Sequence, residues 1–517
     1  MQPHAVTAGT ISTRLAELAN RAPGRMAIEN GDVRVTRAQL DADVTATARQ
    51  IVAASEGRPG NVGLFFDDRI AAVRSIIGAA RSGHAYVTLD AADPEARLRF
   101  ILQDSAPIAL LTEPALLDRA RAIAPEGCPI VDVTHPGTVG DPSALPEVDA
   151  GAMAYLYYTS GSTGKPKGVS QTHVNLQFFV DSYGKRVGIG EGDRISMLYA
   201  VSFAAGIGAI YRGVSLGATL CAYDLKRDGI AQLADWLDRE RITMLHTFPM
   251  VFREMARHLG PRRVLAHLRV IHLGGESLFA GDVERFRAHT LPHCTLVHQL
   301  SATEIAIIAQ NVIRHDTVVP ADGVISVGRP IDGVRIEIRR EDGSLAVVDE
   351  PGEVIACSRH MSPGYWRRPE LDATAFSADP LEPGGRCYRT GDLARIDDAG
   401  YLHFLGRVGN RVKIRGYTID VAEVEAALAS CPDVVNGAVV AEGDASQSAS
   451  RLCAYVEARQ SNRPRYQQTL DEFWSGSRSA CCCRESEGTA DEFRKSSCRA
   501  RKLHCGKCRS RFQNQAR

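Results

Sequence analysis

One short stretch of the sequence, Tyr157–Val169, collects the residue types that bind phosphate, and it reads YYTSGSTGKPKGV. Its glycines free the backbone, its small hydroxyls supply hydrogen-bond donors, and its two lysines add positive charge. Backbone N–H groups and hydroxyls that converge in this way form a cradle for an anion. The candidate phosphate ligands are Thr159, Ser160, Gly161, Ser162, Thr163, Gly164, Lys165 and Lys167. A plain surface loop is the competing interpretation, because Gly and Ser also dominate flexible linkers.

The stretch does not fit the common nucleotide-binding pattern G-x-x-x-x-G-K-[ST]. Gly161 and Gly164 are only three positions apart, and Pro166 follows Lys165. A phosphate site at this position therefore belongs to another class of nucleotide-binding protein.

The elements that would position this stretch alternate between strand-like and helix-like patterns. Ala154–Thr159 is typical of a strand, and Arg269–Leu273 is a short apolar run that ends at two glycines, as a buried strand would. Val251–Leu259 is typical of a helix, with a Gly-Pro stop signal after it. Val334–Ile338 alternates apolar and polar residues and leads to an Asp-Gly turn, which predicts a hairpin. The alternation predicts an α/β architecture with largely parallel sheets.

Length and composition indicate a globular protein of more than one domain. A chain of 517 residues exceeds what one hydrophobic core organises, and 44% hydrophobic and 24% charged residues are ordinary values. The net charge of zero gives no reason to expect a nucleic-acid or membrane partner. No secretory signal pattern opens the chain, and the longest uncharged run, Ile195–Tyr211, is too short to span a bilayer. We therefore expect a cytoplasmic enzyme.

A domain boundary is expected where a basic, glycine-punctuated segment begins. We place a hinge at residues 406–411, between a large domain at 1–405 and a small domain at 412–459. An amphipathic helix is expected to start at Asp420, within the small domain, because a capping-box pattern stands there.

The last segment of the chain, residues 460–517, has a composition of its own. It contains no Ile, Val or Met and only two Leu, with thirteen Lys and Arg against six Asp and Glu. Because a segment without branched apolar residues builds no packed core, we expect disorder. An unrelated reading frame would explain the break.

The thirteen cysteines divide between this tail and the rest of the chain. Six lie in the tail, where the C-x-x-C pair Cys505 and Cys508 makes a zinc knuckle or a nucleic-acid contact conceivable. No second ligand pair stands at a regular spacing, so neither function is expected. The other seven, from Cys128 to Cys453, show no metal or disulfide spacing.

Further blocks of the sequence occur in the order of a known superfamily. These blocks are Gly83–Asp90 (GHAYVTLD), Gly274–Glu276, Gly352–Val354 with Gly364–Trp366 and Arg368–Glu370, Tyr388–Leu393 (YRTGDL), and Gly406–Arg407 with Val412–Gly416 (VKIRG). Together with Tyr157–Val169 they resemble the adenylate-forming superfamily of acyl-CoA synthetases, luciferases and non-ribosomal peptide synthetase adenylation domains. Gly83–Asp90 is more similar to the peptide-synthetase domains than to the CoA ligases. The resemblance extends over residues 10–459.

The resemblance implies a fold and a reaction. The fold is α/β, with a large N-terminal adenylate-forming domain of several subdomains and a small C-terminal α+β domain that is incomplete. In the reaction, a carboxylate attacks the α-phosphate of ATP and yields an acyl-adenylate and pyrophosphate. A thiol then displaces AMP and forms a thioester. A flexible loop with donors and lysine suits the first step, because it neutralises the leaving pyrophosphate.

The resemblance also assigns roles to individual residues. Glu304 stands where the superfamily carries its Mg²⁺ ligand, and this ion prefers oxygen ligands. Asp392 and Arg407 are expected at the ribose of ATP. Lys413 and Gly416 are expected to serve the thioester step, where the glycine lets the phosphopantetheine arm pass close to the backbone. The residues expected at the adenine are Gly274, Gly275, Glu276 and Leu300.

Four departures from the superfamily's pattern change what is expected. Leu300 replaces the aromatic residue that stacks on adenine. In the substrate pocket, Phe203 and Ala204 stand where a Phe-Asp pair salt-bridges the α-amino group of an amino acid, so an acid without that amine fits better. Gly409 replaces the hinge aspartate. The catalytic lysine of the small domain is not recognisable, since Lys507, in the only late Gly-Lys pair, lacks the apolar surroundings of that lysine.

These observations predict an ATP- and Mg²⁺-dependent ligase that activates a carboxylic acid. Its expected partner is an acyl or peptidyl carrier protein, whose phosphopantetheine thiol accepts the product. Two alternatives stay open: a free-standing acyl-CoA ligase, and a catalytically silent nucleotide-binding protein that lacks the C-terminal lysine. No nucleic acid or membrane is expected among the partners.

Overall fold

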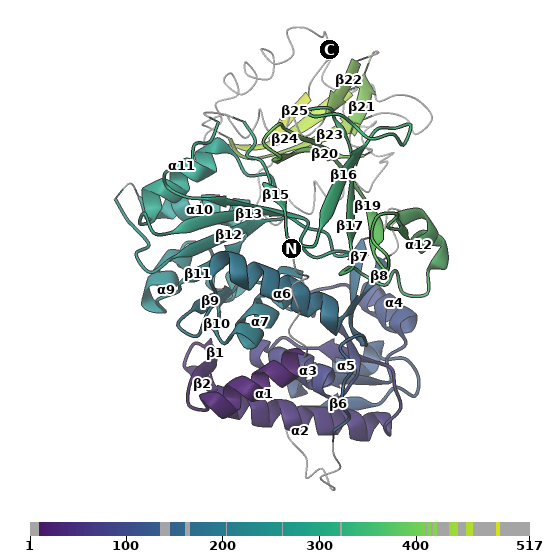
Figure 1. Cartoon of the computed structure of the whole chain (residues 1–517). Coiled ribbons are helices and arrows are strands. Elements are labelled where there is room, and N and C mark those ends of the chain that lie inside the picture. The colour runs from purple at the N-terminus through teal and green to yellow at the C-terminus, as the bar shows by residue number, and fades with distance from the viewer. Residues whose placement is uncertain are drawn as a thin grey trace, which may run out of the picture.

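The structure, a computed structural model of the chain, shows two large sheets below a group of smaller ones (Figure 1). It describes residues 10–134, 145–160, 166–202, 204–260, 262–320, 323–408, 411–414, 417–420, 434–442, 451–458 and 482–485.

The larger sheet has nine strands in the order β15-β14-β13-β12-β11-β9-β10-β1-β2. Its central strands, from β13 to β1, are parallel, and its edges are antiparallel. The strands are β1 (Met26–Asn30), β2 (Val33–Thr36), β9 (Arg194–Met197), β10 (Thr219–Ala222), β11 (Met244–Thr247), β12 (Val270–Gly274), β13 (Thr295–Leu300), β14 (Ala309–Ile313) and β15 (Arg329–Pro330).

The second large sheet has six strands in the order β6-β5-β3-β4-β7-β8, parallel except for the antiparallel pair β7–β8. The strands are β3 (Asn61–Phe65), β4 (Ala85–Leu89), β5 (Ala109–Thr112), β6 (Ile130–Asp132), β7 (Met153–Ser160) and β8 (Pro166–Thr172). All five residues of β3 are buried, as expected for a parallel strand covered on both faces.

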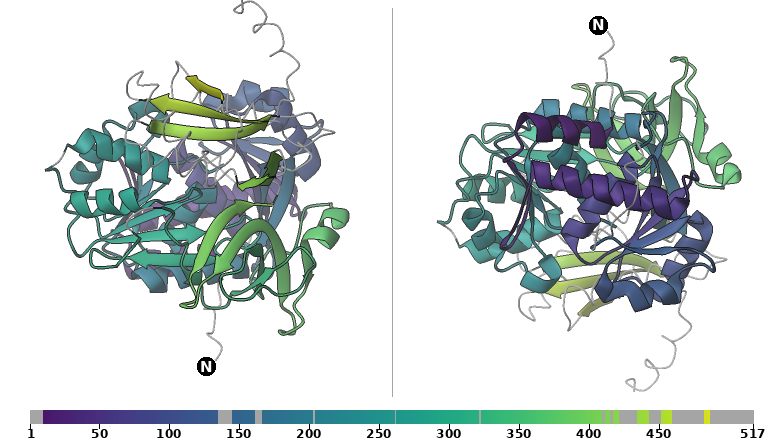
Figure 2. Two further views of the ribbon diagram at one scale, coloured as in Figure 1. Left: turned by 90° about the horizontal axis from the view of Figure 1, so that it is seen from above. Right: turned by 90° about the horizontal axis from the view of Figure 1, so that it is seen from below.

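Helices form layers between and outside these two sheets. One core joins both sheets through α1 (Ile11–Arg21), α2 (Arg37–Ser55), α3 (Arg69–Arg81), α6 (His173–Val187) and α7 (Ala204–Leu216). Figure 2 shows α1 and α2 side by side over this core. A second core covers the outer face of the nine-stranded sheet with α9 (Leu233–Arg239), α10 (Pro249–Leu259) and α11 (Ala280–His289). A third covers the six-stranded sheet with α4 (Glu95–Ser105) and α5 (Leu117–Ile123). Shorter helices are η1 (Pro114–Leu116) and α8 (Leu225–Asp228).

The three local elements predicted from the sequence in this region are confirmed. The strand at Ala154–Thr159 is β7, and the strand at Arg269–Leu273 is β12, one residue later at each end. The predicted helix at Val251–Leu259 is α10, which begins at Pro249 and ends before Gly260. Gly260 has φ +67°, a left-handed conformation that suits glycine and stops the helix.

A five-stranded antiparallel sheet follows, with the order β16-β17-β19-β18 and β20 paired to β19. Its elements are β16 (Arg335–Arg339), β17 (Gly352–Ser358), β18 (Phe376–Ala378), β19 (Arg386–Ile396), β20 (Leu402–Arg407) and the helix α12 (Pro369–Ala375). The predicted hairpin is confirmed, because the chain after β16 turns at Gly343 and the Ala346 N–H donates to the Ile338 carbonyl at 2.8 Å.

Two small sheets complete the described part of the chain. One is the hairpin of β21 (Arg411–Ile414) and β22 (Tyr417–Asp420). The other joins β23 (Val434–Glu442), β24 (Arg451–Ala458) and β25 (Cys482–Glu485) in that order. Asp420 closes β22, and the helix predicted to start there falls on residues 421–433, outside the described residues. The domain boundary at 406–411 stays a prediction.

Strand β25 corrects one expectation about the tail. Composition predicts disorder for residues 460–517, yet Cys482–Glu485 pairs in parallel with β24. The composition argument is wrong for these four residues, because strand pairing uses backbone hydrogen bonds and needs no branched apolar side chains. The rest of the tail lies outside the described residues.

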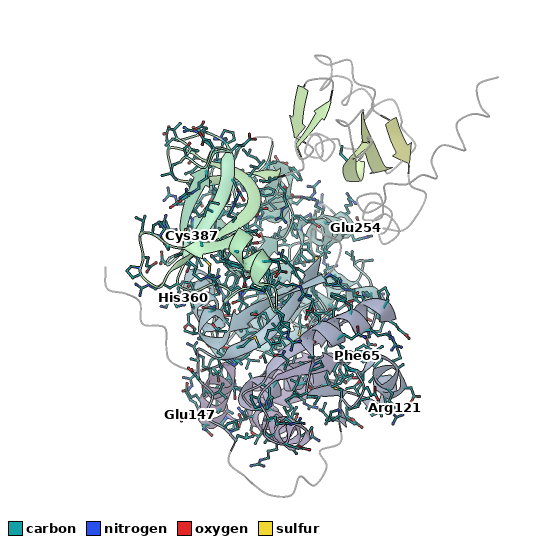
Figure 3. The ribbon with its side chains drawn as sticks, turned by 90° about the vertical axis from the view of Figure 1, so that its right-hand side faces the viewer. Phe65, Arg121, Glu147, Glu254, His360 and Cys387 are labelled. Atoms are coloured by element: carbon teal, nitrogen blue, oxygen red, sulfur yellow. A yellow bond between two sulfur atoms is a disulfide. The ribbon has the colours of Figure 1, made fainter. Side chains whose placement is uncertain are left out.

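A disulfide between Cys357 and Cys387 corrects another expectation. The two cysteines are register partners on β17 and β19, with Cα atoms 4.0 Å apart. Cys387 is labelled in Figure 3. Spacing gives no sign of this pair, because the register of two strands brings together residues 30 positions apart. Within the described residues, no helix is both long and apolar enough to cross a membrane.

Candidate functional site

The hairpin of β7 and β8 presents the predicted phosphate loop. The two strands pair as far as Ser160 opposite Pro166, and residues 161–165, between them, lie outside the described residues. The Thr159 hydroxyl oxygen is buried and has no hydrogen-bond partner among the described residues. A buried hydroxyl without a partner is uncommon in proteins. The Thr159 hydroxyl is therefore available to donate a hydrogen bond to a ligand beside the loop.

Glu304 lies against the same hairpin. Its Oε1 is 3.2 Å from the Nζ of Lys167 on β8, and it accepts a hydrogen bond from the Tyr365 hydroxyl at 2.7 Å. The Lys167 ammonium also lies 3.8 Å from the centroid of the Tyr365 ring. Glu304 is only 5% exposed. The structure therefore brings together Lys167 and Glu304, the residues predicted to bind phosphate and metal.

Backbone contacts fix the segments that carry these three side chains. The Gln171 side chain on β8 donates to the Thr303 carbonyl at 2.9 Å. The Ser362 N–H donates to the Glu304 carbonyl at 2.7 Å, and the Ser170 N–H donates to the Gly364 carbonyl at 3.0 Å. Strand β8 is therefore tied to both segments, which limits how far the Glu304 carboxylate can move.

Two tyrosines beside Glu304 remain neutral phenols. Burial raises the pKa of Tyr365 and of Tyr388 far above the ordinary value, and the Glu304 carboxylate adds to both shifts. A phenol that keeps its proton can donate a hydrogen bond to the carboxylate. Both tyrosines belong to sequence blocks that carry the resemblance, but the sequence predicted no role for either.

Asp392 and Arg407 meet on the adjacent strands β19 and β20. Arg407 Nε lies 3.2 Å from Asp392 Oδ1, and Arg407 Nη2 donates to the Thr390 carbonyl at 2.8 Å. Burial raises the pKa of Asp392 to about 6; Arg407 opposes the shift, and the carboxylates of Glu304 and Glu353 add to it. This pair of predicted ribose residues therefore lies within the electrostatic reach of Glu304.

The residues predicted at the adenine lie where β12 and β13 end. Gly274 closes β12 opposite Gln299, and Leu300, half-buried, closes β13. Gly275 has φ +81°, and a Cβ there would come within 3.0 Å of the Phe248 ring. Glu276 accepts a hydrogen bond from the Met250 N–H at 3.0 Å, in the first turn of α10.

The predicted substrate pocket lies at the start of α7, which begins at Ala204. Phe203 is outside the described residues. The preceding Ser202 donates its hydroxyl to Asp90 at 3.0 Å, and its carbonyl accepts from the Tyr157 hydroxyl. Asp90 was not predicted as a neighbour of this pocket, although it closes the block Gly83–Asp90.

Other predicted site residues are placed only in part. Lys413 belongs to β21, whereas Gly409, Gly416 and Lys507 lie outside the described residues.

Glu304 is a buried carboxylate beside the phosphate hairpin that could share a metal ion with phosphate oxygens. Elsewhere in the described residues, Cys357, Asp379 and Cys387 form a cluster of three potential ligands. In that cluster the two sulfurs are bonded to each other, and Asp379 is paired with Arg335 at 2.7 Å.

Comparison with known proteins agrees, over most of the chain, with the family resemblance seen in the sequence. Residues 15–366 match the family of AMP-binding enzymes. A plipastatin synthase from Bacillus subtilis (strain 168) is 32% identical over 450 residues, which is 86% of this chain and 12% of that protein. Tyrocidine synthase 1 from Brevibacillus parabrevis is 30% identical over 461 residues, 87% of this chain and 40% of that protein. The chain thus spans less than half of each relative.

Solved structures share the fold. A four-domain nonribosomal peptide synthetase bound to AMP and glycine superposes with a TM-score of 0.78 at 24% identity, covering 90% of this chain and 34% of that one. The O-succinylbenzoate coenzyme A synthetase from Bacillus subtilis, in complex with AMP, has a TM-score of 0.76 at 23% identity. The match covers 92% of this chain and 94% of that one. The predicted fold class, a large adenylate-forming α/β domain, is confirmed.

Proposed function

The chain belongs to the family of AMP-binding enzymes, which are adenylate-forming ligases, and on this premise we propose a specific reaction for it. It activates a carboxylic acid with ATP and Mg²⁺ as an acyl-adenylate, and passes the acyl group to the phosphopantetheine thiol of a carrier protein. The observation that supports this best is the contact of Lys167, Glu304 and Tyr365 at the base of the phosphate hairpin.

The phosphate hairpin fits the charge that adenylate formation develops. Lys167 and the free hydroxyl of Thr159 would stabilise the oxygens of the departing pyrophosphate. The loop residues Ser160, Gly161, Ser162, Thr163, Gly164 and Lys165 complete this proposed phosphate site. Glu304 would hold Mg²⁺, which neutralises phosphate charge when it is bound.

The ATP nucleoside is proposed to lie along the strand ends. The Asp392 carboxylate would accept hydrogen bonds from the ribose hydroxyls, with Arg407 holding it in place at 3.2 Å. The adenine would lie against Gly274, Gly275, Glu276 and Leu300. Because Glu276 already accepts a hydrogen bond from a backbone N–H of α10, we propose that it holds the segment after β12 in place and does not contact the adenine directly.

The acid is proposed to lack an α-amino group. Phe203 and Ala204 supply no carboxylate to pair with such a group. A buried ammonium without a counter-charge would be costly there.

The acceptor is proposed to be a carrier protein, because the similar proteins include a four-domain nonribosomal peptide synthetase. Lys413 and Gly416 would serve this thioester step. Coenzyme A is the alternative acceptor, favoured by the similarity in fold to a coenzyme A synthetase.

Two measurements on the full chain test the proposal. ATP–pyrophosphate exchange, screened across aromatic, aliphatic and amino acids, should appear with at least one acid that lacks an α-amine and should require Mg²⁺. Intact-mass analysis with a phosphopantetheinylated carrier protein should then show an acyl thioester, with none on coenzyme A. Exchange with no acid, despite measurable ATP binding, would instead identify a catalytically silent nucleotide-binding protein.

A further inference from the structure

A row of polar side chains crosses one face of the nine-stranded sheet, beneath α6 and α7. His246 on β11 and His272 on β12 are register partners, and the register partners Gln299 on β13 and Gln310 on β14 lie two positions further along the strands. His246, His272 and Gln310 are 3%, 8% and 2% exposed. Each has a buried polar atom with no hydrogen-bond partner among the described residues: His246 Nδ1, His272 Nε2 and Gln310 Oε1. Protein interiors satisfy nearly all such atoms, so three in one row indicate a missing partner.

Arg212 on α7 brings a positive charge to this row. It is only 9% exposed, and its guanidinium carbon lies 4.0 Å from the centroid of the Tyr183 ring on α6. The Tyr183 ring contacts His246 and His272 edge-on, at 5.8 and 5.5 Å between centroids. Among the described residues, no carboxylate influences the pKa of Arg212, which burial lowers. A buried guanidinium without an acidic neighbour is rare.

The two histidines add no second positive charge to this face of the sheet. Burial lowers the pKa of His272 to about 3 and that of His246 well below the ordinary value, and the positive charge of Arg212 adds to both shifts. Both rings are therefore neutral near pH 7, and each can donate one hydrogen bond. We call Arg212, His246, His272 and Gln310 the polar cluster; it combines one uncompensated cation with neutral hydrogen-bonding groups.

The polar cluster lies next to the segments proposed to bind the acid and the adenine. Ala204 and Gly208 are one turn apart on α7, and a Cβ on Gly208 would lie 3.5 Å from Nη1 of Arg212. A Cβ on Gly274, in the proposed adenine segment, would lie 3.7 Å from Cε1 of His272. Ligands of open α/β sheets bind at the carboxyl ends of the strands, where β12 and β13 end. An acid whose reacting carboxylate lies near Ala204 would therefore extend toward Arg212.

We propose that the acid activated by this protein carries a second carboxylate, which pairs with Arg212 and accepts hydrogen bonds from the neutral histidines. This inference rests on the proposed function and names its substrate class, a dicarboxylic acid. The cation–π contact with Tyr183 alone does not account for the arrangement, because it leaves a ring nitrogen of His246 and one of His272 unpaired.

The test measures binding as well as activity on the full chain. Isothermal titration with succinate, glutarate, adipate, isophthalate and terephthalate is compared with the half-methyl ester of each acid, which removes one charge at nearly constant shape. At least one diacid should bind about tenfold or more tightly than its half-ester, since a charged hydrogen-bonded pair is involved. Arg212→Met should abolish that preference, and Arg212→Lys should keep part of it.

Matched variants separate the charge at this position from general effects. Arg186→Met removes an exposed guanidinium on the same side of the sheet, whose Nη1 is 3.5 Å from the Gln310 carbonyl, and should leave the preference unchanged. Gly208→Leu keeps Arg212 and places a bulky side chain against its guanidinium, so it should also weaken diacid binding. This second variant tests the inference even where Arg212→Met fails to fold.

The outcomes for the inference and for the proposed function are distinct. Diacids and half-esters that bind equally, or no binding of any diacid, would overturn the inference. Exchange that proceeds equally well with monocarboxylic acids would overturn it as well, and would leave the proposed function standing. Selective diacid binding without ATP-dependent chemistry would support the pairing with Arg212 and count against the proposed function.

Discussion

At the scale of single residues, Glu304 shows how charges in the candidate site compensate each other. Its carboxylate is buried and, among the described residues, pairs with the cation Lys167, which belongs to the phosphate hairpin. An incoming triphosphate would compete for that lysine, and a divalent ion on Glu304 would then compensate the carboxylate. The phenol of Tyr365 donates to Glu304 throughout, because its raised pKa keeps it protonated.

Glu304→Gln should slow the Mg²⁺-dependent formation of adenylate. The amide keeps the shape and loses the charge, and metal stabilisation worth several kcal/mol predicts a loss of about 10²-fold or more. Pyrophosphate exchange measured against Mg²⁺ concentration checks this. Glu350→Gln, at a surface carboxylate paired with Arg340 at 2.6 Å, is the control and should change nothing. An unaltered Mg²⁺ dependence in the Glu304 variant would remove Glu304 from the site.

Asp392 gives the protein a pH-dependent stability. Its folded pKa of about 6 lies above the ordinary 3.8, mainly because of burial, so the folded state holds the proton more tightly than the unfolded state. The contribution of Asp392 to the free energy of unfolding therefore falls as pH rises from 3.8 to about 6. Asp392→Asn should be more stable than the parent above this range, by up to about 3 kcal/mol, and lose the advantage below it.

Denaturant unfolding at a series of pH values measures this difference. Asp397→Asn is a control of opposite sign: burial raises the pKa of Asp397, but the hydrogen bond and charge of His403, together with backbone N–H groups, outweigh burial and lower the pKa. A pH-independent difference between the Asp392 variant and the parent would contradict the raised pKa of Asp392.

The ATP affinity of the parent should rise as pH rises from 3.8 to about 6, because the ribose hydroxyls need an ionised acceptor at Asp392.

At the scale of elements, the turn before Tyr365 decides where its phenol lies. Gly364 has φ +141°, and its carbonyl accepts from Ser170 on β8. The Tyr365 N–H donates to Asp372 at 2.7 Å, so the turn is held from both sides. Only glycine suits this conformation without strain.

Gly364→Ala should destabilise the protein by about 1–3 kcal/mol and lower the rate of exchange, because a Cβ would overlap the Asp372 carboxylate and displace Tyr365. Gly343→Ala is the matched control. Gly343 also has a positive φ of +84°, but a Cβ there meets nothing within 4 Å, so only the backbone cost remains. Thermal unfolding and exchange assays compare the two, and equal losses in both variants would show that Gly364 has no special role.

The scale of elements is also where prediction from sequence succeeded. Strand β7, helix α10 and strand β12 followed from local periodicity and stop signals, which depend on residues close in the chain. The blocks around Lys167 and Glu304 could be found for the same reason, since each is a short continuous string.

At the scale of the whole molecule, local sequence patterns do not predict which distant residues come into contact. Lys167, Glu304 and Tyr365 come from three segments, and only the folded chain shows that they touch. The disulfide of Cys357 and Cys387 depends on strand register, as do the polar cluster's histidines, which meet because β11 and β12 are parallel and aligned. No spacing rule signals such contacts, because they form between residues far apart in sequence.

The last prediction concerns the two half-reactions of the whole chain. If no lysine takes the missing catalytic role, nothing fixes the carboxylate against the α-phosphate, and adenylate formation should be slow. Correct positioning is worth several powers of ten in rate. A preformed acyl-adenylate offered with carrier protein should therefore be consumed far faster than ATP with free acid, because we propose that the thioester step depends instead on the region of Lys413 and Gly416. Rapid pyrophosphate exchange by the unmodified chain would contradict this, and Lys507→Ala would then decide whether that late lysine carries the first half-reaction.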